Sequence, residues 1–161
     1  MNAILRIVGG VSAILGGLLR IANVFTTTLP QGTLAVLYLL TDVLLLAGVA
    51  GLWLKRRSTL GWCATAGLTI FVLGILTIRA SAFGIGSYRL GAFIVLVGLA
   101  MYSVEALLRR NTALLAPVMW LVAVAAGIAA AAGIVPPVMM MTAGVTFGAG
   151  FVAAGWQVLR G

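Results

Sequence analysis

Histidine is missing from this chain, cysteine occurs once, and there are only two acidic residues. Without histidine there is no imidazole to act as a general base or to ligate a haem or a catalytic metal. The two carboxylates, Asp42 and Glu105, belong to opposite ends of different apolar segments, so they cannot form a close acid–base pair. The single Cys63 cannot form an intramolecular disulfide. We therefore expect no enzymatic activity, no cofactor and no metal site.

Polar residues are too few to build a soluble domain. Charged residues make up 7% of the chain, hydrophobic residues make up 63%, and the mean hydropathy is +1.25. A separate globular domain needs roughly 50 residues, and no segment between the apolar runs approaches that length. The glycines occur inside the apolar runs, without the strand-to-helix context of a phosphate-binding loop. Residues 1–161 are therefore expected to form one domain.

Six apolar runs, each of about twenty residues, fill almost the whole chain, and their length matches the thickness of a bilayer. The connections between them are short, which places neighbouring helices side by side and antiparallel. The sequence thus predicts an all-α, polytopic membrane protein whose six transmembrane helices form three antiparallel hairpins. The predicted spans are residues 3–25, 34–54, 60–81, 86–108, 114–133 and 135–159.

Basic residues cluster at alternate ends of the predicted spans. They follow the second, fourth and sixth spans, at Lys55–Arg57, Arg109–Arg110 and Arg160, whereas two of the alternate connections carry no charge. By the positive-inside rule these ends and both termini face the cytoplasm, which indicates a multi-pass protein of a bacterial-type cytoplasmic membrane. The formal charge of +8 then sets the topology and attracts anionic lipid headgroups. Because the basic residues form no continuous face, nucleic acid is not an expected partner.

The same cytoplasmic end carries the tryptophans and one of the carboxylates. The tryptophans are expected to form an interfacial aromatic belt, which independently supports the predicted topology. Glu105 lies four residues before Arg109, the favourable order for an ion pair on one helix. The tryptophans are Trp53, Trp62, Trp120 and Trp156.

A weak internal repeat relates the first and third spans. Leu15–Phe25 aligns without gaps to Leu73–Phe83, and leucine, glycine, alanine and phenylalanine recur at matching positions. Residues this common in membrane helices also coincide by chance, so the alignment fits either a duplication or a coincidence. If the hairpins are duplicated, they are parallel repeats related by an axis along the membrane normal.

Ionisable residues inside apolar spans are costly, so each is expected to have a partner or a function. Arg20 and Asp42 lie one to two turns inside the outer boundaries of neighbouring spans, where they can form an ion pair. Arg79 and Arg89 belong to the same outer half. An excess of arginine over carboxylate suits an anionic or zwitterionic ligand, such as a carboxylate, a phosphate or a lipid headgroup. Alternatively, Arg79 and Arg89 extend into the outer headgroups and leave a neutral pair without a ligand.

Two polar neighbours extend this candidate ligand-binding site. Asn23 lies on the same stripe of the first span as Arg20, and Tyr38 lies one turn from Asp42 on the second span. The predicted site comprises Arg20, Asp42, Arg79, Arg89, Asn23 and Tyr38.

Small residues recur on one face of the last span, at Gly144, Gly148 and Gly155. Glycine at these spacings permits close approach of another helix backbone. The alanine-rich fifth span is the expected packing partner, because the connection between the two spans is short. The alternative is that the stripe docks a partner protein or a second copy of the chain.

Two functions remain open. In the first, the chain is a small transporter, or the solute-binding component of one, that holds a small anionic or zwitterionic solute or a lipid headgroup in its outer half. In the second, it is a structural or accessory subunit that docks on a larger membrane complex by its glycine stripe. A binding protein needs an accessible polar cavity around Asp42, whereas a subunit can be solid there.

Overall fold

The computed structural model describes the chain except for residues 1–2, 27–28, 110–113, 137 and 161, so Arg110 of the predicted basic cluster lies outside the described residues. Within these bounds the chain forms six α-helices and no strand. The helices are α1 (Ala3–Phe25), α2 (Gln31–Arg56), α3 (Trp62–Ser81), α4 (Tyr88–Arg109), α5 (Leu115–Ala131) and α6 (Met139–Leu159).

Five of the six helices are long and apolar enough to cross a membrane, and α5 is the exception. It has 17 residues and is about 26 Å long, which is shorter than a hydrocarbon core of about 30 Å. The predicted span of residues 114–133 is therefore too long. Gly133 ends the helix in the left-handed conformation at φ 70°, and the Ile134 N–H returns to the Ala129 carbonyl. This hydrogen-bond pattern is a Schellman motif, which stops α5 before it reaches full length.

The other boundaries lie within two residues of the predicted ones, except the starts of α2 and α6. α2 begins at Gln31 rather than near Leu34, directly after Pro30, whose carbonyl accepts a hydrogen bond from the Leu34 N–H at 3.1 Å. α6 begins at Met139 rather than near residue 135. Val135 precedes Pro136, and a residue before proline is disfavoured in the α conformation.

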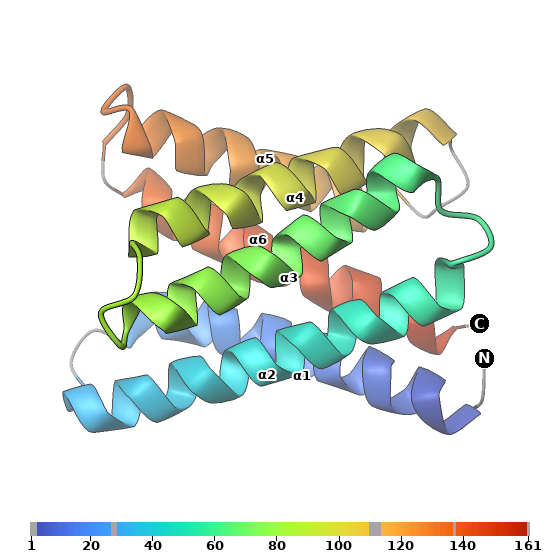
Figure 1. Ribbon diagram of the computed structural model, residues 1–161, viewed down its shortest axis with the longest axis horizontal. Helices are drawn as coiled ribbons and strands as arrows, with labels where there is room; N and C mark the ends of the chain where they lie inside the picture. Colours follow the sequence, from blue (N-terminus) through green and yellow to red (C-terminus); the bar gives the residue numbers. More distant parts are fainter. Residues whose placement is uncertain (1–2, 27–28, 110–113, 137, 161) are drawn as a thin grey trace.

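The helices run alternately up and down the bundle (Figure 1). α1 packs closely on α2, α3 on α4, and α5 on α6, so each successive pair forms a hairpin. We call the end where α1 begins and α6 ends the terminal end. The opposite end, where the connections within the three hairpins lie, is the hairpin end. The hairpins join through α1 on α6 and α4 on α5, whereas α2 and α3 make few contacts with each other.

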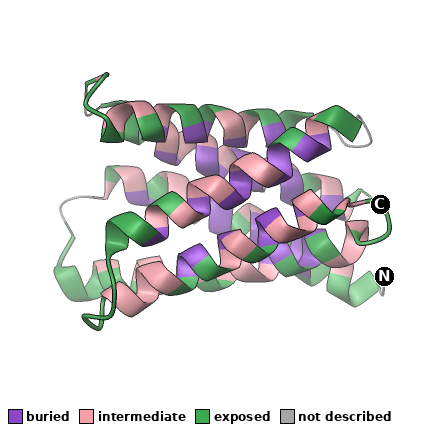
Figure 2. Ribbon diagram, turned by 45° about the horizontal axis from the view of Figure 1, so that its top comes forward, coloured by how far each residue is buried: buried purple, intermediate pink, exposed green. Residues whose placement is uncertain are grey.

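An aromatic cluster occupies the interior, on the inner faces of the helices that Figure 2 shows as buried. The Trp120 ring lies edge-on to the rings of Phe151 and Tyr102, with centroid-to-centroid distances of 5.0 Å and 5.5 Å. The rings of Phe71 and Phe147 stack with their centroids 6.2 Å apart. Trp120 has no exposed surface, and its indole N–H donates to the Phe147 carbonyl at 3.3 Å. Its assignment to an interfacial belt is therefore wrong. Trp120 packs against Phe151 and Tyr102 in the interior of the bundle, with its ring pointing inward.

The glycine stripe of α6 packs against α1. A Cβ on Gly148 would lie 2.5 Å from the Gly17 carbonyl oxygen, and a Cβ on Gly155 would lie 2.5 Å from the Gly10 oxygen. Gly144 faces Val24, about two turns beyond Gly17 on α1. α5 packs on α6 as predicted, but at positions such as Gly150, whereas the glycine stripe itself faces α1 and is not free to dock a partner. The stripe is covered within the chain itself, because α1 also carries small residues at matching positions.

The three hairpins bury residues at equivalent positions. In each hairpin a central residue of the first helix lies against a glycine of the second: Ala13 against Gly48, Phe71 against Gly98, and Trp120 against Gly150. The buried positions around these central residues also recur with the same spacing. They are Gly9, Gly10, Gly16 and Gly17 on α1, Gly67, Leu68, Gly74 and Ile75 on α3, and Ala116, Pro117, Ala123 and Val124 on α5. This repetition supports a duplicated hairpin.

Candidate functional site

Asp42 forms an ion pair with Arg79, in which the Arg79 Nε donates to Asp42 Oδ2 across α2 and α3. The side chains retain 14% and 28% of their exposure, respectively, so the pair is partly shielded. The predicted partner of Asp42 was Arg20, and this pairing is corrected. Asp42 lies on the face of α2 that is turned to α3, whereas Arg20 lies on the face of α1 that is turned to α6.

Arg20 is half-buried, and its Cζ lies 5.7 Å from the centroid of the Phe147 ring on α6. A guanidinium over an aromatic face gains a cation–π attraction that grows as water is removed. Arg20 also acts electrostatically on the Asp42 carboxylate. Within the described part of the chain its guanidinium donates no hydrogen bond. Arg20 is therefore held in place while its N–H donors remain available.

Asn23 has a structural partner beside the ion pair. Its Nδ2 donates to the Thr41 hydroxyl oxygen at 3.0 Å, and the Thr41 hydroxyl donates to the Leu37 carbonyl at 2.7 Å. Asn23 and Thr41 are both buried. This chain of hydrogen bonds ties α1 to α2 next to Asp42.

The remaining predicted site residues lie around the ion pair without bonding to it. Tyr38 is half-buried one turn before Asp42, and Arg89 is exposed at the start of α4. Among the described residues, neither forms a hydrogen bond or an ion pair with Asp42 or Arg79. Of the predicted residues, the structure pairs Asp42 with Arg79 and places Arg20 where it acts electrostatically on Asp42. We call these three residues the arginine cluster.

The arginine cluster carries one net positive charge, because two guanidiniums face one carboxylate. A guanidinium has five N–H donors, and Arg79 gives only its Nε to Asp42. The Nη donors of Arg79 and all donors of Arg20 are left without a protein acceptor in the described residues. Planar donors of this kind match carboxylate and phosphate groups.

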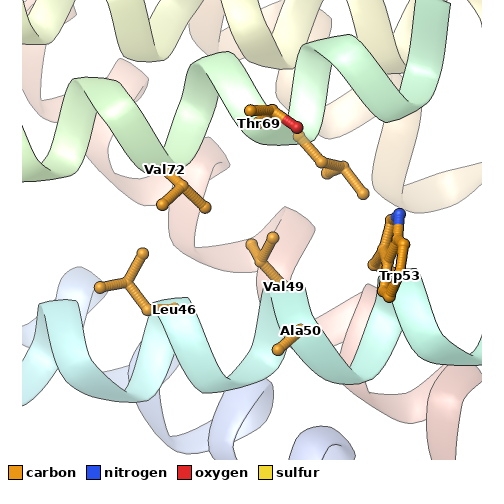
Figure 3. A pocket seen from close by; sticks show the side chains of 7 residues that line it. Leu46, Val49, Ala50, Trp53, Thr69 and Val72 are labelled. Atoms are coloured by element: carbon orange, nitrogen blue, oxygen red, sulfur yellow. The ribbon is translucent and has the colours of Figure 1, made fainter. Parts of the chain in front are cut away.

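An apolar groove lies between α2 and α3 (Figure 3), and Leu46 at one end of its lining is one helical turn from Asp42. Its volume is about 350 Å³. Buried Val49 and Leu68 form its floor, and the more exposed Trp53 and Thr69 lie at its edge. The Thr69 hydroxyl is bonded to its own helix, at the Thr65 carbonyl, so the groove offers a ligand an apolar wall. The groove is lined by Leu46, Val49, Ala50, Trp53, Leu68, Thr69 and Val72.

The second carboxylate, Glu105, has a structural role at the terminal end. Its Oε1 accepts from Arg109 Nε at 2.6 Å, which confirms the ion pair predicted from the sequence. Its Oε2 accepts from the backbone N–H of Ala64, in the first turn of α3. The first N–H groups of a helix lack internal partners and carry partial positive charge, so a carboxylate from α4 caps α3. Sequence spacing gave no signal for this contact between helices.

Lys55 also makes a structural contact that the sequence did not reveal. Its Nζ donates to the Gln157 carbonyl near the end of α6, and Arg56 Nη2 donates to Gln157 Oε1 at 3.0 Å. The last carbonyls of a helix are unpaired and carry partial negative charge, so a lysine stabilises them. These basic residues therefore join α2 to α6 as well as marking one end of the bundle.

No cluster of three or more potential metal-ligating residues occurs within the described ranges. No protein-family model, curated protein or solved structure matches the chain. The arginine cluster and the adjoining groove are therefore the features on which a functional argument rests.

Proposed function

We propose that this protein is a small membrane component that binds an anionic group at the arginine cluster, either as a transporter or as the binding part of one. The observation that carries the proposal is the excess of guanidinium over carboxylate. Arg79 is paired with Asp42, Arg20 acts electrostatically on the same carboxylate, and most of their N–H donors are left for a ligand. Asp42 fixes the position of Arg79, and Phe147 fixes that of Arg20. The site is thus preorganised for an acid group.

The cost of placing arginine in an apolar bundle supports a ligand. On insertion scales, an arginine costs about 2.5–3.5 kcal/mol at the centre of a membrane helix and less toward its ends, where Arg20 and Arg79 lie. The ion pair compensates for Arg79, but Arg20 has only the Phe147 ring and the field of Asp42. Charge-assisted hydrogen bonds from an acid group to Arg20 and Arg79 offset this cost.

The proposed orientation places the arginine cluster in the outer half of a cytoplasmic membrane. The basic residues Lys55, Arg56, Arg57 and Arg160 lie at the terminal end, which by the positive-inside rule faces the cytoplasm. The hairpin end, and with it the arginine cluster, then faces outward. A role as an accessory subunit docked by the glycine stripe is not proposed, because α1 covers that stripe.

Native mass spectrometry of the protein in mild detergent tests the proposal. The protein is titrated in parallel with phosphatidylglycerol, with phosphatidylcholine and with inorganic phosphate, so that a lipid headgroup and a free anion are distinguished. We expect the wild-type protein to retain an anionic species in preference to phosphatidylcholine. Arg20→Gln and Arg79→Gln should each reduce this preference.

Arg57→Gln is the matched control, because it removes one arginine charge from an exposed position at the opposite end of the bundle. This variant should retain the anionic species as the wild type does. The proposal is wrong if all three variants bind anions equally well, or if Arg57→Gln weakens binding as much as the two cluster variants.

A further inference from the structure

Because the three hairpins share the same pattern of buried positions, the interfaces between neighbouring hairpins can be compared residue by residue. These interfaces, which we call seams, are α6 on α1, α2 on α3 and α4 on α5. On α6, Gly148 lies two residues before the central Gly150, and Gly155 lies five residues after it. The same positions around Gly48 on α2 are occupied by Leu46 and Trp53. At the positions where α6 places glycines against α1, α2 therefore places large side chains against α3.

The facing helices show the same contrast. On α1, Gly10 and Gly17 flank the central Ala13, and both touch the backbone of α6. The equivalent positions around Phe71 on α3 are Leu68 and Ile75. The seam between α6 and α1 is closed by backbone contact, whereas bulky residues hold α2 and α3 apart. The groove of about 350 Å³ between them is thus a consequence of the sequence at these positions.

From this groove and the charge at its end we infer that the ligand of the arginine cluster is an anionic lipid. The lipid places one acyl chain between α2 and α3 and its acid group against Arg20 and Arg79. This inference rests on the proposed function and names its ligand class. The groove supplies what a chain needs, an apolar wall formed by residues such as Val49 and Val72.

The groove and the ion pair lie in line along α2. The lining residues run from Leu46 to Trp53, about 10 Å along the helix, and Asp42 lies one turn, about 6 Å, before Leu46. One leaflet contributes about 15 Å to the hydrocarbon core of a bilayer. A chain that starts at the ion pair and ends beside Trp53 therefore has the length of the chains in one leaflet.

The access route favours a lipid over a small solute from water. α2 and α3 are both apolar enough to cross a membrane, so the seam between them opens toward hydrocarbon. Ala50, Trp53 and Thr69 are exposed along the edge of the groove. A molecule already dissolved in the bilayer can enter sideways without crossing water. The single net positive charge of the arginine cluster selects among such molecules for those with an anionic headgroup.

Photochemical cross-linking of the wild-type protein in vesicles tests this inference. The probe is phosphatidylglycerol with a diazirine in the middle of one chain, present as a minor component of phosphatidylcholine vesicles. After irradiation, the labelled residues are located by mass spectrometry of peptides. We expect the label to concentrate on the groove residues of α2 and α3, and a phosphatidylcholine probe of the same chain structure to label them less.

Variants that fill the groove provide a second test in the same cross-linking experiment. Val72→Phe and Ala50→Phe each add bulk to the groove, so both should prevent cross-linking of the phosphatidylglycerol probe to α2 and α3. The matched control is Leu73→Phe, which adds an aromatic ring to the exposed surface of α3 next to Val72. This control should be labelled like the wild type. Circular dichroism of each variant confirms that the helices are intact, and the use of two filling variants guards against misfolding of either one.

The outcomes separate the two proposals. If native mass spectrometry shows an anion preference that depends on Arg20 and Arg79, but the chain label spreads over all six helices, the lipid inference is wrong and the proposed function stands. If the groove is labelled equally by both lipids and the arginine variants change nothing, both proposals are wrong. Labelling that is selective for phosphatidylglycerol and is lost in both filling variants supports both.

Discussion

Gly148→Ala should destabilise the protein, because it adds a methyl group at the closest approach of α1 and α6. The new Cβ would lie 2.5 Å from the Gly17 carbonyl oxygen and 2.7 Å from Ile21 Cγ1. Carbon and carbonyl oxygen normally approach no closer than about 3.3 Å. The oxygen belongs to the backbone, so the clash is relieved only when the two helices separate.

The magnitude follows from two opposing effects. Overpacking of a well-packed interface costs about 1–3 kcal/mol, whereas replacing glycine by alanine inside a helix gains at most about 1 kcal/mol. We therefore expect Gly148→Ala to lower the free energy of unfolding by up to about 2 kcal/mol. Reversible unfolding by sodium dodecyl sulfate in mixed micelles, followed by circular dichroism, measures this change.

Gly127→Ala is the matched control for this measurement. Gly127 is also a buried glycine in a helix, but a Cβ there would lie 3.4 Å from Leu96 Cδ1, an ordinary contact. This variant should be as stable as the wild type or slightly more stable. If Gly148→Ala and Gly127→Ala unfold at the same detergent fraction, the close packing of α1 on α6 is refuted.

Two further predictions concern the carboxylates. Glu105→Ala removes the acceptor of the buried Ala64 N–H, so it should lower the free energy of unfolding by about 1–3 kcal/mol. Arg109→Ala should lower it by less than about 1 kcal/mol, because that side chain is half exposed. Equal losses in the two variants would contradict the capping role of Glu105. Asp42→Asn removes the carboxylate that holds Arg79 in place, so phosphatidylglycerol should bind more weakly by about 1 kcal/mol, roughly fivefold. An unchanged or tighter lipid complex in native mass spectrometry would show that Asp42 does not position Arg79 for the ligand.

The positions of the helices along the chain could be predicted from hydropathy alone. The predicted first span, residues 3–25, coincides with α1, because a continuous apolar run in lipid must satisfy its backbone hydrogen bonds as a helix. The shortness of α5 was missed, since Gly133 and Pro136 lie within an apolar run that hydropathy reads as continuous. Local turn chemistry decided that boundary.

The sequence could predict which half of the bundle holds each of these polar side chains. It could not predict which neighbouring helix each side chain faces. Arg20, Asp42 and Arg79 lie in the same half of the bundle, as their distances from the helix ends indicate. Which arginine meets Asp42 depends on which helices pack together. Proximity in sequence favoured Arg20, whereas in the structure α3 supplies the partner. The inward direction of Trp120 was missed for the same reason.

The glycine stripe illustrates the same limit. Gly144, Gly148 and Gly155 correctly indicate a close helix contact, because glycine at these spacings allows backbones to meet. Their partner is α1, at the other end of the sequence, and no local signal identifies it. Closure of the bundle between its first and last helices is a property of the whole chain.

Electron paramagnetic resonance of spin-labelled lipids measures the lipid selectivity of the protein in a bilayer. We expect the wild-type protein to restrict the motion of more phosphatidylglycerol than phosphatidylcholine. The combined substitution of Arg20→Gln and Arg79→Gln should abolish this difference, while Arg57→Gln should preserve it. Equal restriction of the two lipids by the wild type, or an undiminished preference after both cluster arginines are replaced, would contradict an anionic-lipid site at the arginine cluster.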